Sequence, residues 1–205
     1  MDNQLIKRQA REAFVGHQVS RQRDGRWLLQ RPYADGRGWD WTMAAEVISL
    51  VGGGLYVGGD IDFVIFSWFS DSRDHEAKVR WMGRGTDLEY YVRQKAIIGT
   101  GRELIEVYDE DAARRALQAV LDDRLEDGEA SELTDQISEL LLHGDLADRD
   151  YMLRQLQETS SDFVADGGYR IGMVMAARVY YAHAALARLC DLLDARDAEE
   201  ASHAC

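Results

Sequence analysis

Two aspartates, Asp60 and Asp62, come closest to a catalytic arrangement. They lie in the segment GGDID, directly before an apolar run. Side chains at positions i and i+2 of a strand point to the same side, so these carboxylates could together bind the cations that two-metal phosphoryl transfer requires. The alternative is that both occupy the polar start of a strand and face water.

This pair resembles, in outline, the Asp-x-Asp strand of nucleotidyltransferases. The resemblance implies a metal-dependent nucleotide enzyme, which we keep as an alternative function. That family places a longer helical segment between its glycine motif and its acidic pair, whereas five residues separate Gly54 from Asp60, and no serine follows the glycine. We therefore favour the solvated strand start and expect neither a metal site nor a catalytic residue.

The remaining reactive side chains form no recognisable catalytic motif. The glycine clusters match no phosphate-binding loop, and the five histidines are scattered without metal-ligand spacing. Cys190 falls within a predicted helix and suits a small core residue better than a nucleophile. We expect a protein that is not an enzyme and uses no cofactor.

A basic and aromatic segment could instead bind single-stranded nucleic acid. Arginines and aromatic residues alternate between residues 21 and 41, a combination that suits phosphate contacts and base stacking. Asp24, Asp35 and Asp40 dilute this charge, and the overall acidity opposes binding to phosphate. We therefore expect no direct binding of nucleic acid.

The net charge of −13 is unevenly distributed along the 205 residues. Residues 1–100 carry 14 Lys+Arg and 13 Asp+Glu, whereas residues 101–205 carry 10 Arg and 24 Asp+Glu. The second part is therefore acidic, which either keeps its helices soluble or forms a surface that binds something basic.

The two cysteines, Cys190 and Cys205, indicate a reducing compartment. Charges interrupt every long apolar run, and the N-terminal segment lacks the apolar core of a signal peptide. We expect a soluble protein in the bacterial cytoplasm, with no membrane contact.

The stretch from Ala45 to Phe69 is the longest apolar run, and its glycine clusters divide it into extended pieces. Residues 63–69 are apolar on both faces, which is typical of the covered centre of a sheet. Asp24-Gly25 predicts a two-residue type I′ hairpin between residues 17–23 and 26–31, and Trp39–Val51 is the next expected strand. The first 70 residues therefore predict an antiparallel β-meander.

Helical periodicity dominates after residue 70. We expect helices over residues 71–82, capped by Asp71 or Ser72, and from Thr86 to Gly99. Four more are expected over 110–127, 132–142, 146–157 and 169–194, with Asp109 and Ser131 as the caps of the first two. In the last helix, Val174, Ala177, Tyr181 and Ala184 should face the core or a partner subunit, and the tail from Arg196 should fray. A short helix over residues 4–14 precedes the strands. The predicted fold is α+β, a single domain with a β-rich part (1–70) and a helical part (71–205).

Helical spacing turns two sets of carboxylates away from the predicted core. In the helix 110–127 they oppose the Leu117 stripe, and in the helix 132–142 they oppose Leu133, Ile137 and Leu140. Residues 103–166 hold 19 Asp+Glu and 5 Arg. The candidate partner-binding residues are Asp111, Asp122, Glu126, Glu132, Asp135 and Glu139.

Three segments, GDIDFVIFSWFSD, VRWMGRGTDLEYYVRQKA and AARVYYAHAALARLCDLL, resemble small accessory proteins of tailed phages and prophages. The resemblance implies a gene product acting inside a bacterial cell. With no active site and an acidic helical part, we expect an anti-CRISPR-like inhibitor whose partner is a basic host protein or ribonucleoprotein, a CRISPR surveillance complex above all. The other alternative is a phage structural protein that forms a homo-oligomer through its apolar helices.

Overall fold

The computed structural model describes residues 3–50, 53–60, 63–67, 74–84, 106–128, 131–165 and 167–203. The chain divides into two compact units. The helical unit comprises Glu106–Val174, and the sheet unit comprises Asp2–Ile105 together with Met175–Cys205. The last helix therefore belongs to the same unit as the N-terminal strands, although the helical unit, about 70 residues long, lies between the two parts of the sheet unit in the sequence.

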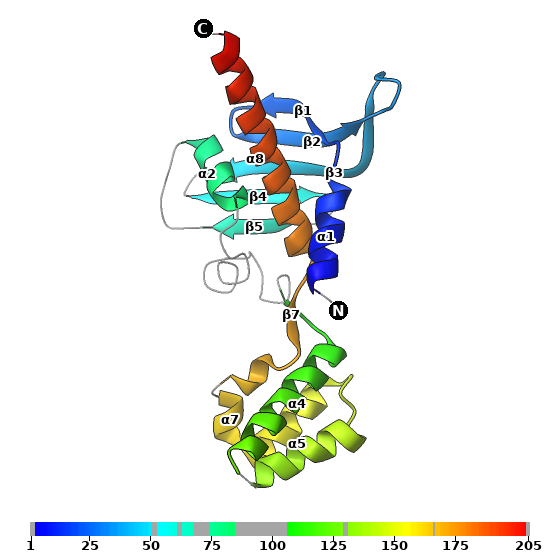
Figure 1. Cartoon of the computed structure of the whole chain (residues 1–205), viewed down its shortest axis with the longest axis vertical. Coiled ribbons are helices and arrows are strands. Elements are labelled where there is room, and N and C mark those ends of the chain that lie inside the picture. Colours follow the sequence, from blue (N-terminus) through cyan, green and yellow to red (C-terminus); the bar gives the residue numbers. More distant parts are fainter. Residues whose placement is uncertain are drawn as a thin grey trace. The chain divides into compact units, whose positions relative to one another are not determined.

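The sheet unit is built on a five-stranded antiparallel meander in the order β1-β2-β3-β4-β5 (Figure 1). The chain is therefore α+β, with an N-terminal meander followed by a helical C-terminal half, as the sequence predicted. The strands are β1 (Gln18–Arg23), β2 (Arg26–Pro32), β3 (Trp39–Leu50), β4 (Gly54–Gly59) and β5 (Val64–Ser67).

The hairpin at Asp24-Gly25 is confirmed, but its predicted turn type is wrong. Arg23 pairs with Arg26 across the two-residue loop, and Gly25 has a φ of +64°. A type I′ turn needs a positive φ at both loop residues. Asp24 does not adopt one, because an L residue is strained in the left-handed region and glycine accepts it freely.

The segment predicted as the covered centre of the sheet lies instead at its end. β5 pairs with β4 and is the last strand in the order of the described sheet. Val64 and Phe66 are buried on the face that also carries Trp27, Val47 and Leu55, whereas Ile65 on the opposite face is half-buried. The central strands are β2 to β4, so the apolar composition of β5 did not indicate a central position.

Three helices complete the core of the sheet unit: α1 (Asn3–Ala13), α2 (His75–Gly83) and α8 (Ala177–His203). In Figure 1, α8 runs across the sheet between α1 and α2. Their buried side chains pack against the inner face of the strands. Complete burial of one such side chain, for example Leu186, contributes about 2–3 kcal/mol.

The start of α2 differs from the prediction. The helix begins at His75 rather than near residue 71, and Asp74 caps it by accepting a hydrogen bond from the Ala77 N–H at 2.9 Å. Asp71 and Ser72, the predicted caps, and the helix predicted from Thr86 lie outside the described residues. The predicted N-terminal helix is confirmed as α1.

The last helix begins eight residues later than predicted. Residues 168–170 form a 3₁₀ turn, Gly172 has a φ of +77°, and Met173–Met175 form strand β7, which pairs with β6 (Glu106–Tyr108). The left-handed glycine interrupts any helix that periodicity would extend through it. The tail that we expected to fray after residue 196 is helical to His203.

The buried residues of α8 also differ from those expected. Ala177, expected in the core, is exposed in the first turn, and Tyr181 is half-buried. Ala184 is buried as expected. The most deeply buried residues on this helix are Val179, Ala182, Ala185, Leu186 and Leu189.

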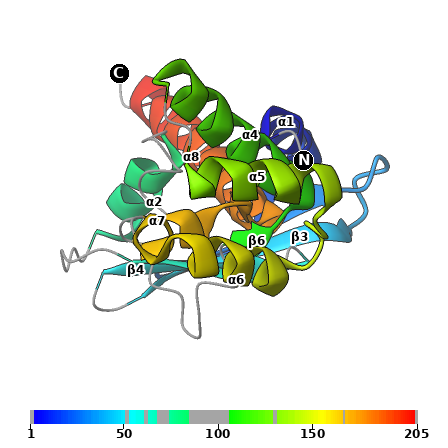
Figure 2. The same ribbon diagram turned by 90° about the horizontal axis from the view of Figure 1, so that it is seen from below.

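The helical unit contains α4 (Glu110–Glu126), α5 (Glu132–His143), α6 (Arg149–Thr159) and α7 (Ser161–Ala165). The predicted caps are confirmed: Asp109 accepts from the Ala112 N–H at 2.8 Å, and Ser131 forms a capping box with Thr134. Figure 2 shows α5 packed between α4 and α6. Their shared core includes Leu117, Ile137 and Leu156.

None of the helices among the described residues combines the length and apolar composition needed to cross a bilayer.

Two histidines of the sheet unit should make its stability depend on pH. His17 is fully buried, and the Nε2 atom of His183 lies 3.1 Å from the Met82 carbonyl oxygen. Burial lowers the pKa of both side chains below the ordinary value of 6.5. The unfolded chain therefore binds more protons below pH 6.5, and the stabilisation from the neutral rings is lost as the pH falls from 6.5 toward the lowered pKa values.

We expect the free energy of unfolding to fall by about 1 kcal/mol or more between pH 6.5 and 5. His183→Gln can keep the hydrogen bond to Met82 and should reduce this slope. Chemical denaturation followed by tryptophan fluorescence measures the unfolding of the sheet unit, since all five tryptophans lie in it. Hydrogen bonds from Arg84 and Arg80 lower the pKa of the Asp194 carboxyl group. The stabilisation from this carboxylate is therefore lost only as the pH falls below 3.8, outside the range of this test. Equal slopes for the variant and the wild type would contradict the prediction.

Candidate functional site

The excess negative charge is confined to the helical unit. Glu106–Val174 carries 18 Asp+Glu and 6 Arg, a net charge of −12, whereas the rest of the chain has a net charge of −1. The sequence suggested an acidic second half, but α8 and its arginines belong to the sheet unit. The acidic surface is therefore a property of one compact unit.

The predicted carboxylates on α4 and α5 are all exposed. On α4, Asp111, Asp122 and Glu126 lie opposite the buried stripe of Ala113, Leu117 and Leu121. On α5, Glu132, Asp135 and Glu139 lie opposite Leu133, Ile137 and Leu140. Each helix thus carries an acidic stripe, and we call the two together the acidic faces.

Few cations neutralise these faces. Arg114 pairs with Glu110 at 3.3 Å and donates to the Leu141 carbonyl oxygen, and Arg170 pairs with Glu106. Asp122 accepts a hydrogen bond from the Gln118 amide at 2.7 Å. None of the six carboxylates forms an ion pair with another described residue. Like charges therefore repel one another along both helices.

Two exposed leucines interrupt the acidic faces. Leu125 is 57% exposed and follows Asp122 by three residues, and Leu142 is 73% exposed and follows Glu139 by three. Residues three apart are neighbours on a helix surface. The sequence analysis missed both, although their position outside the buried stripe could have indicated them. The acidic faces therefore include exposed apolar side chains as well as carboxylates.

Asp60 has a structural environment that accounts for it. Its carboxylate accepts a hydrogen bond from the Ala44 N–H at 3.1 Å, and its own N–H donates to the Ala44 carbonyl oxygen. It thereby holds β3 beside Met43, which has a φ of +60° where the register of β2 and β3 shifts. Asp62 lies outside the described residues. No group of three potential metal ligands occurs among the residues whose positions are described.

The basic and aromatic segment retains only part of its stacking surface. Trp27 is buried in the core, whereas Tyr33 and Trp41 are exposed by 52% and 60%. Arg31 donates to the Ala13 carbonyl oxygen at 3.2 Å, which ties the segment to α1. The segment therefore fits an ordinary exposed hairpin better than a surface that binds nucleic acid.

A serine, a histidine and an aspartate come together at the β1–β2 turn. His75 Nδ1 lies 2.9 Å from Ser49 Oγ, and His75 Nε2 lies 3.4 Å from Asp24 Oδ1. Ser49 is 9% exposed and the imidazole covers Gly25, where an added Cβ would lie 3.1 Å from the ring. The arrangement ties α2 to the hairpin and leaves the hydroxyl poorly placed for attack on a substrate.

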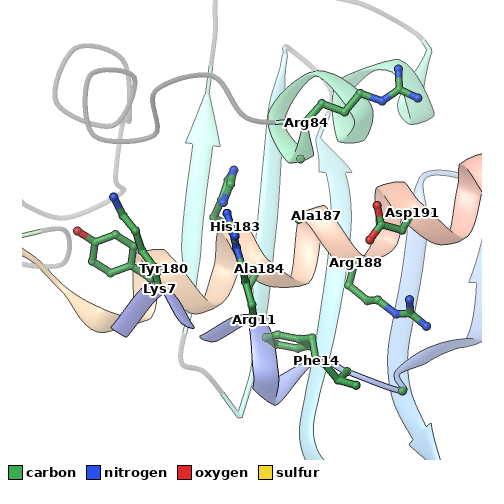
Figure 3. Close-up of a pocket in the computed structure, with 13 residues that line it drawn as sticks. Lys7, Arg11, Phe14, Arg84, Tyr180, His183, Ala184, Ala187, Arg188 and Asp191 are labelled. Carbon is green, nitrogen blue, oxygen red and sulfur yellow. The ribbon is translucent and has the colours of Figure 1, made fainter. Parts of the chain in front are cut away.

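A basic cavity lies between α1 and α8, next to the end of α2 (Figure 3). It has a volume of about 670 Å³ and is lined by Lys7, Arg11, Arg84 and Arg188, with Asp191 as its one carboxylate. The sequence analysis did not find this group. Its members come from three helices far apart in sequence, so no motif connects them.

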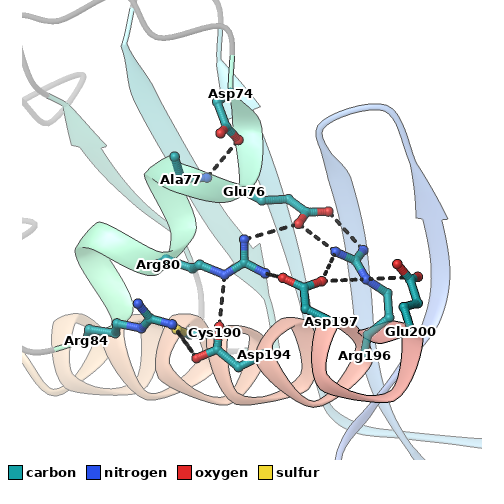
Figure 4. Close-up of polar contacts among 10 residues, drawn as sticks. All are labelled: Asp74, Glu76, Ala77, Arg80, Arg84, Cys190, Asp194, Arg196, Asp197 and Glu200. Atoms are coloured by element: carbon teal, nitrogen blue, oxygen red, sulfur yellow. Dashed lines mark hydrogen bonds and ion pairs between the residues drawn. The ribbon is translucent and has the colours of Figure 1, made fainter. Parts of the chain in front are cut away.

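An ion-pair network beside this cavity joins α2 to the second half of α8 (Figure 4). Arg80 contacts Glu76, Asp194 and Asp197 at 3.4, 2.9 and 2.5 Å, and Arg196 donates two hydrogen bonds to Glu76. The hydrogen bonds to Glu76, followed by that to Asp197, raise the pKa of Arg196. This network accounts for the ordered end of α8.

No protein-family model, curated protein or solved structure matches the chain. Its function is therefore inferred from the charges, contacts and cavities of the chain.

Proposed function

We propose that the chain is a non-enzymatic inhibitor that binds a basic partner through the acidic faces of its helical unit. The observation that supports this proposal is the confinement of the excess charge to one unit, which carries a net −12 and in which none of the six carboxylates of the acidic faces pairs with another described residue. A basic partner would relieve the repulsion among these carboxylates and would be attracted from a distance.

The leucines favour a protein partner over a simple counter-ion effect. Leu125 and Leu142 place apolar contacts among charges, a combination that protein interfaces use, with charges directing association and apolar contacts holding the complex. A channel lined by arginine and lysine for a guide or target strand suits such a surface. We therefore favour a CRISPR surveillance complex in the cytoplasm of a phage-infected bacterium, in keeping with the resemblance to phage accessory proteins.

Oligomerisation through the apolar helices has less support. Most apolar residues of α8 are buried in the core of their own unit, where Val179, Ala182 and Leu189 are inaccessible to solvent. The described part of this helix thus keeps little apolar surface for a second copy.

The proposal is tested by the salt dependence of association with a purified surveillance complex. For the wild type, the association rate should fall about tenfold or more between 0.1 and 1 M salt, because the Debye length shrinks from about 10 to about 3 Å. The variant Glu132→Gln/Asp135→Asn/Glu139→Gln should associate several-fold more slowly at low salt. The matched control is Glu12→Gln/Glu46→Gln/Glu199→Gln, which removes the same charge from exposed positions of the sheet unit.

Leu142→Ser separates the role of the leucine from that of the charges. It should leave the association rate nearly unchanged and speed dissociation by about tenfold, as loss of an apolar interface contact does. A salt-independent association rate, or equal effects of the two charge variants, would show that the acidic faces serve solubility alone.

A further inference from the structure

Strand β1 forms one edge of the sheet that the structure describes. It is the first strand in the order β1-β2-β3-β4-β5 (Figure 1). Among the described residues, backbone hydrogen bonds join β1 to β2 and to no other segment. In an edge strand, alternate residues direct their N–H and C=O groups away from the neighbouring strand. β1 can therefore pair with a further strand on its other side.

Three arginines lie together on one face of this edge. Arg23 is opposite Arg26 of β2, and Arg21 lies two residues before Arg23, so their side chains share a face. This face is the one opposite to that of Trp27 and the core. The three arginines are exposed, and none forms an ion pair with another described residue, including Glu46 on the same face. The edge thus presents positive charge that no described carboxylate neutralises.

The edge is regular over residues 21–23. The one irregularity in the pairing of β1 with β2 lies between Val19 and Arg21, where the Ser20 hydroxyl donates to Gln30 Oε1 at 2.6 Å. A bulge limits strand pairing at an edge, and here that limit falls outside residues 21–23. Strands β6 and β7 of this chain pair over three residues each. A regular edge of this length can therefore hold a short strand.

The arginines decide which kind of strand can be added. A second copy of β1 would bring its own Arg21 and Arg23 against these side chains, and like charges on neighbouring strands are destabilising. An acidic strand would instead form opposite-charge pairs with them. The same charges therefore oppose pairing between copies of this chain and favour an acidic segment.

The inner side of the edge indicates what should lie between the acidic residues. Gln22 is opposite Trp27, so side chains along the edge alternate between the two faces. Beside Gln22, an open cavity of about 670 Å³ is lined by Asp24 and Glu76 among others. These carboxylates would repel a further carboxylate but accept an uncharged polar side chain. The expected pattern is therefore an alternation of acidic and uncharged polar residues.

We propose that β1 binds an extended acidic segment of a partner protein, which joins the sheet as a further strand. Main-chain hydrogen bonds to β1 supply affinity, and carboxylates at alternate positions pair with Arg21 and Arg23. The residue between these carboxylates faces the cavity beside Gln22. This surface belongs to the sheet unit and includes none of the acidic faces, so this proposal and the proposed function can fail separately.

The test is a nuclear magnetic resonance titration of the full chain with the capped peptide Thr-Glu-Thr-Glu-Thr-Glu-Thr. We expect saturable shifts of the amide resonances of residues 18–26, with a dissociation constant at or below about 1 mM. The peptide Thr-Thr-Glu-Glu-Glu-Thr-Thr has the same charge but places its carboxylates on both faces, so it should bind about fivefold more weakly. The first peptide methylated at every backbone nitrogen keeps its carboxylates but should not bind, because its N–H donors are lost.

Variants of the chain test the role of the arginines. Arg21→Gln/Arg23→Gln should weaken binding of the alternating peptide by about tenfold, because both opposite-charge pairs are lost. The matched control is Arg8→Gln/Arg37→Gln, which removes two exposed arginines of the sheet unit that lie outside β1. Unchanged melting of both variants would show that the fold is intact.

The proposal is wrong if the alternating peptide shifts none of these resonances at millimolar concentration. Equal binding of the two unmethylated peptides, or equal weakening by the two variants, would reduce the effect to general charge attraction and also contradict it. Equally tight binding of a peptide with the sequence of β1 would indicate pairing between copies of this chain instead. Tighter binding of a single-stranded oligonucleotide at the same residues would assign the arginines to nucleic acid and overturn the proposal.

Discussion

Replacing Ala185 by arginine is expected to unfold the sheet unit. Ala185 is fully buried on α8, in the core formed with the inner face of the sheet. An arginine there would either bury an unpaired charge or force α8 away from the strands. The expected loss is about 4 kcal/mol or more, a large part of the stability of an ordinary domain. The loss should appear as an unfolded tryptophan spectrum in buffer.

Ala177→Arg is the control for this substitution. Ala177 lies on the same helix and is exposed in its first turn, so the arginine side chain can reach water. We expect a change within about 0.5 kcal/mol, as at other exposed positions. Unfolding by Ala177→Arg, or a native Ala185→Arg protein, would show that the buried face of α8 is assigned incorrectly.

Gly59→Ala is expected to have the second largest effect, because the backbone of β3 leaves no room for a side chain. Gly59 has a φ of +123°, and an added Cβ would lie 2.3 Å from the Ala44 carbonyl oxygen. That oxygen also accepts the hydrogen bond from the Asp60 N–H, so it cannot move without breaking the contact. We expect a loss of about 3 kcal/mol, measured as a lower denaturation midpoint by tryptophan fluorescence.

Gly167→Ala separates the two causes of this loss. Gly167 has a similar φ of +128°, but no atom lies within 4 Å of its added Cβ. It should cost about 1–2 kcal/mol, the backbone strain alone, measured on the helical unit by far-ultraviolet circular dichroism. If Gly59→Ala lowered the free energy of unfolding no more than Gly167→Ala does, the close approach of the β3 backbone to Gly59 would contribute nothing to the loss.

Much of the local structure could be predicted because it depends on residues that are close together in the sequence. Helix caps and hairpins depend on neighbouring residues, so Asp109, Ser131 and Asp24-Gly25 indicated their elements without knowledge of the fold. Helical periodicity likewise placed the carboxylates of α4 and α5 on exposed faces, because the opposite stripe had to be buried. The order of strands in the meander followed from short connections between successive strands.

The sequence did not determine where β5 lies in the sheet or where α8 begins. An apolar strand can be central or at the end of a sheet, depending on what covers it, and a left-handed Gly172 interrupts a periodicity that continues on both sides. Because α8 packs against the N-terminal sheet, it belongs to the nearly neutral sheet unit and not to the acidic helical unit. This packing joins residues that are far apart in the sequence.

The sequence by itself thus determined the element types, the caps and the acidic faces, because each depends on residues within a few positions of one another. Only the tertiary structure brought Lys7, Arg11, Arg84 and Arg188 to one cavity. Lys7 and Arg11 come from α1, Arg84 follows the last residue of α2, and Arg188 comes from α8. The packing of the three helices against one another decides their distances. No spacing in the chain records that packing, since it results from burial of apolar side chains across the whole unit.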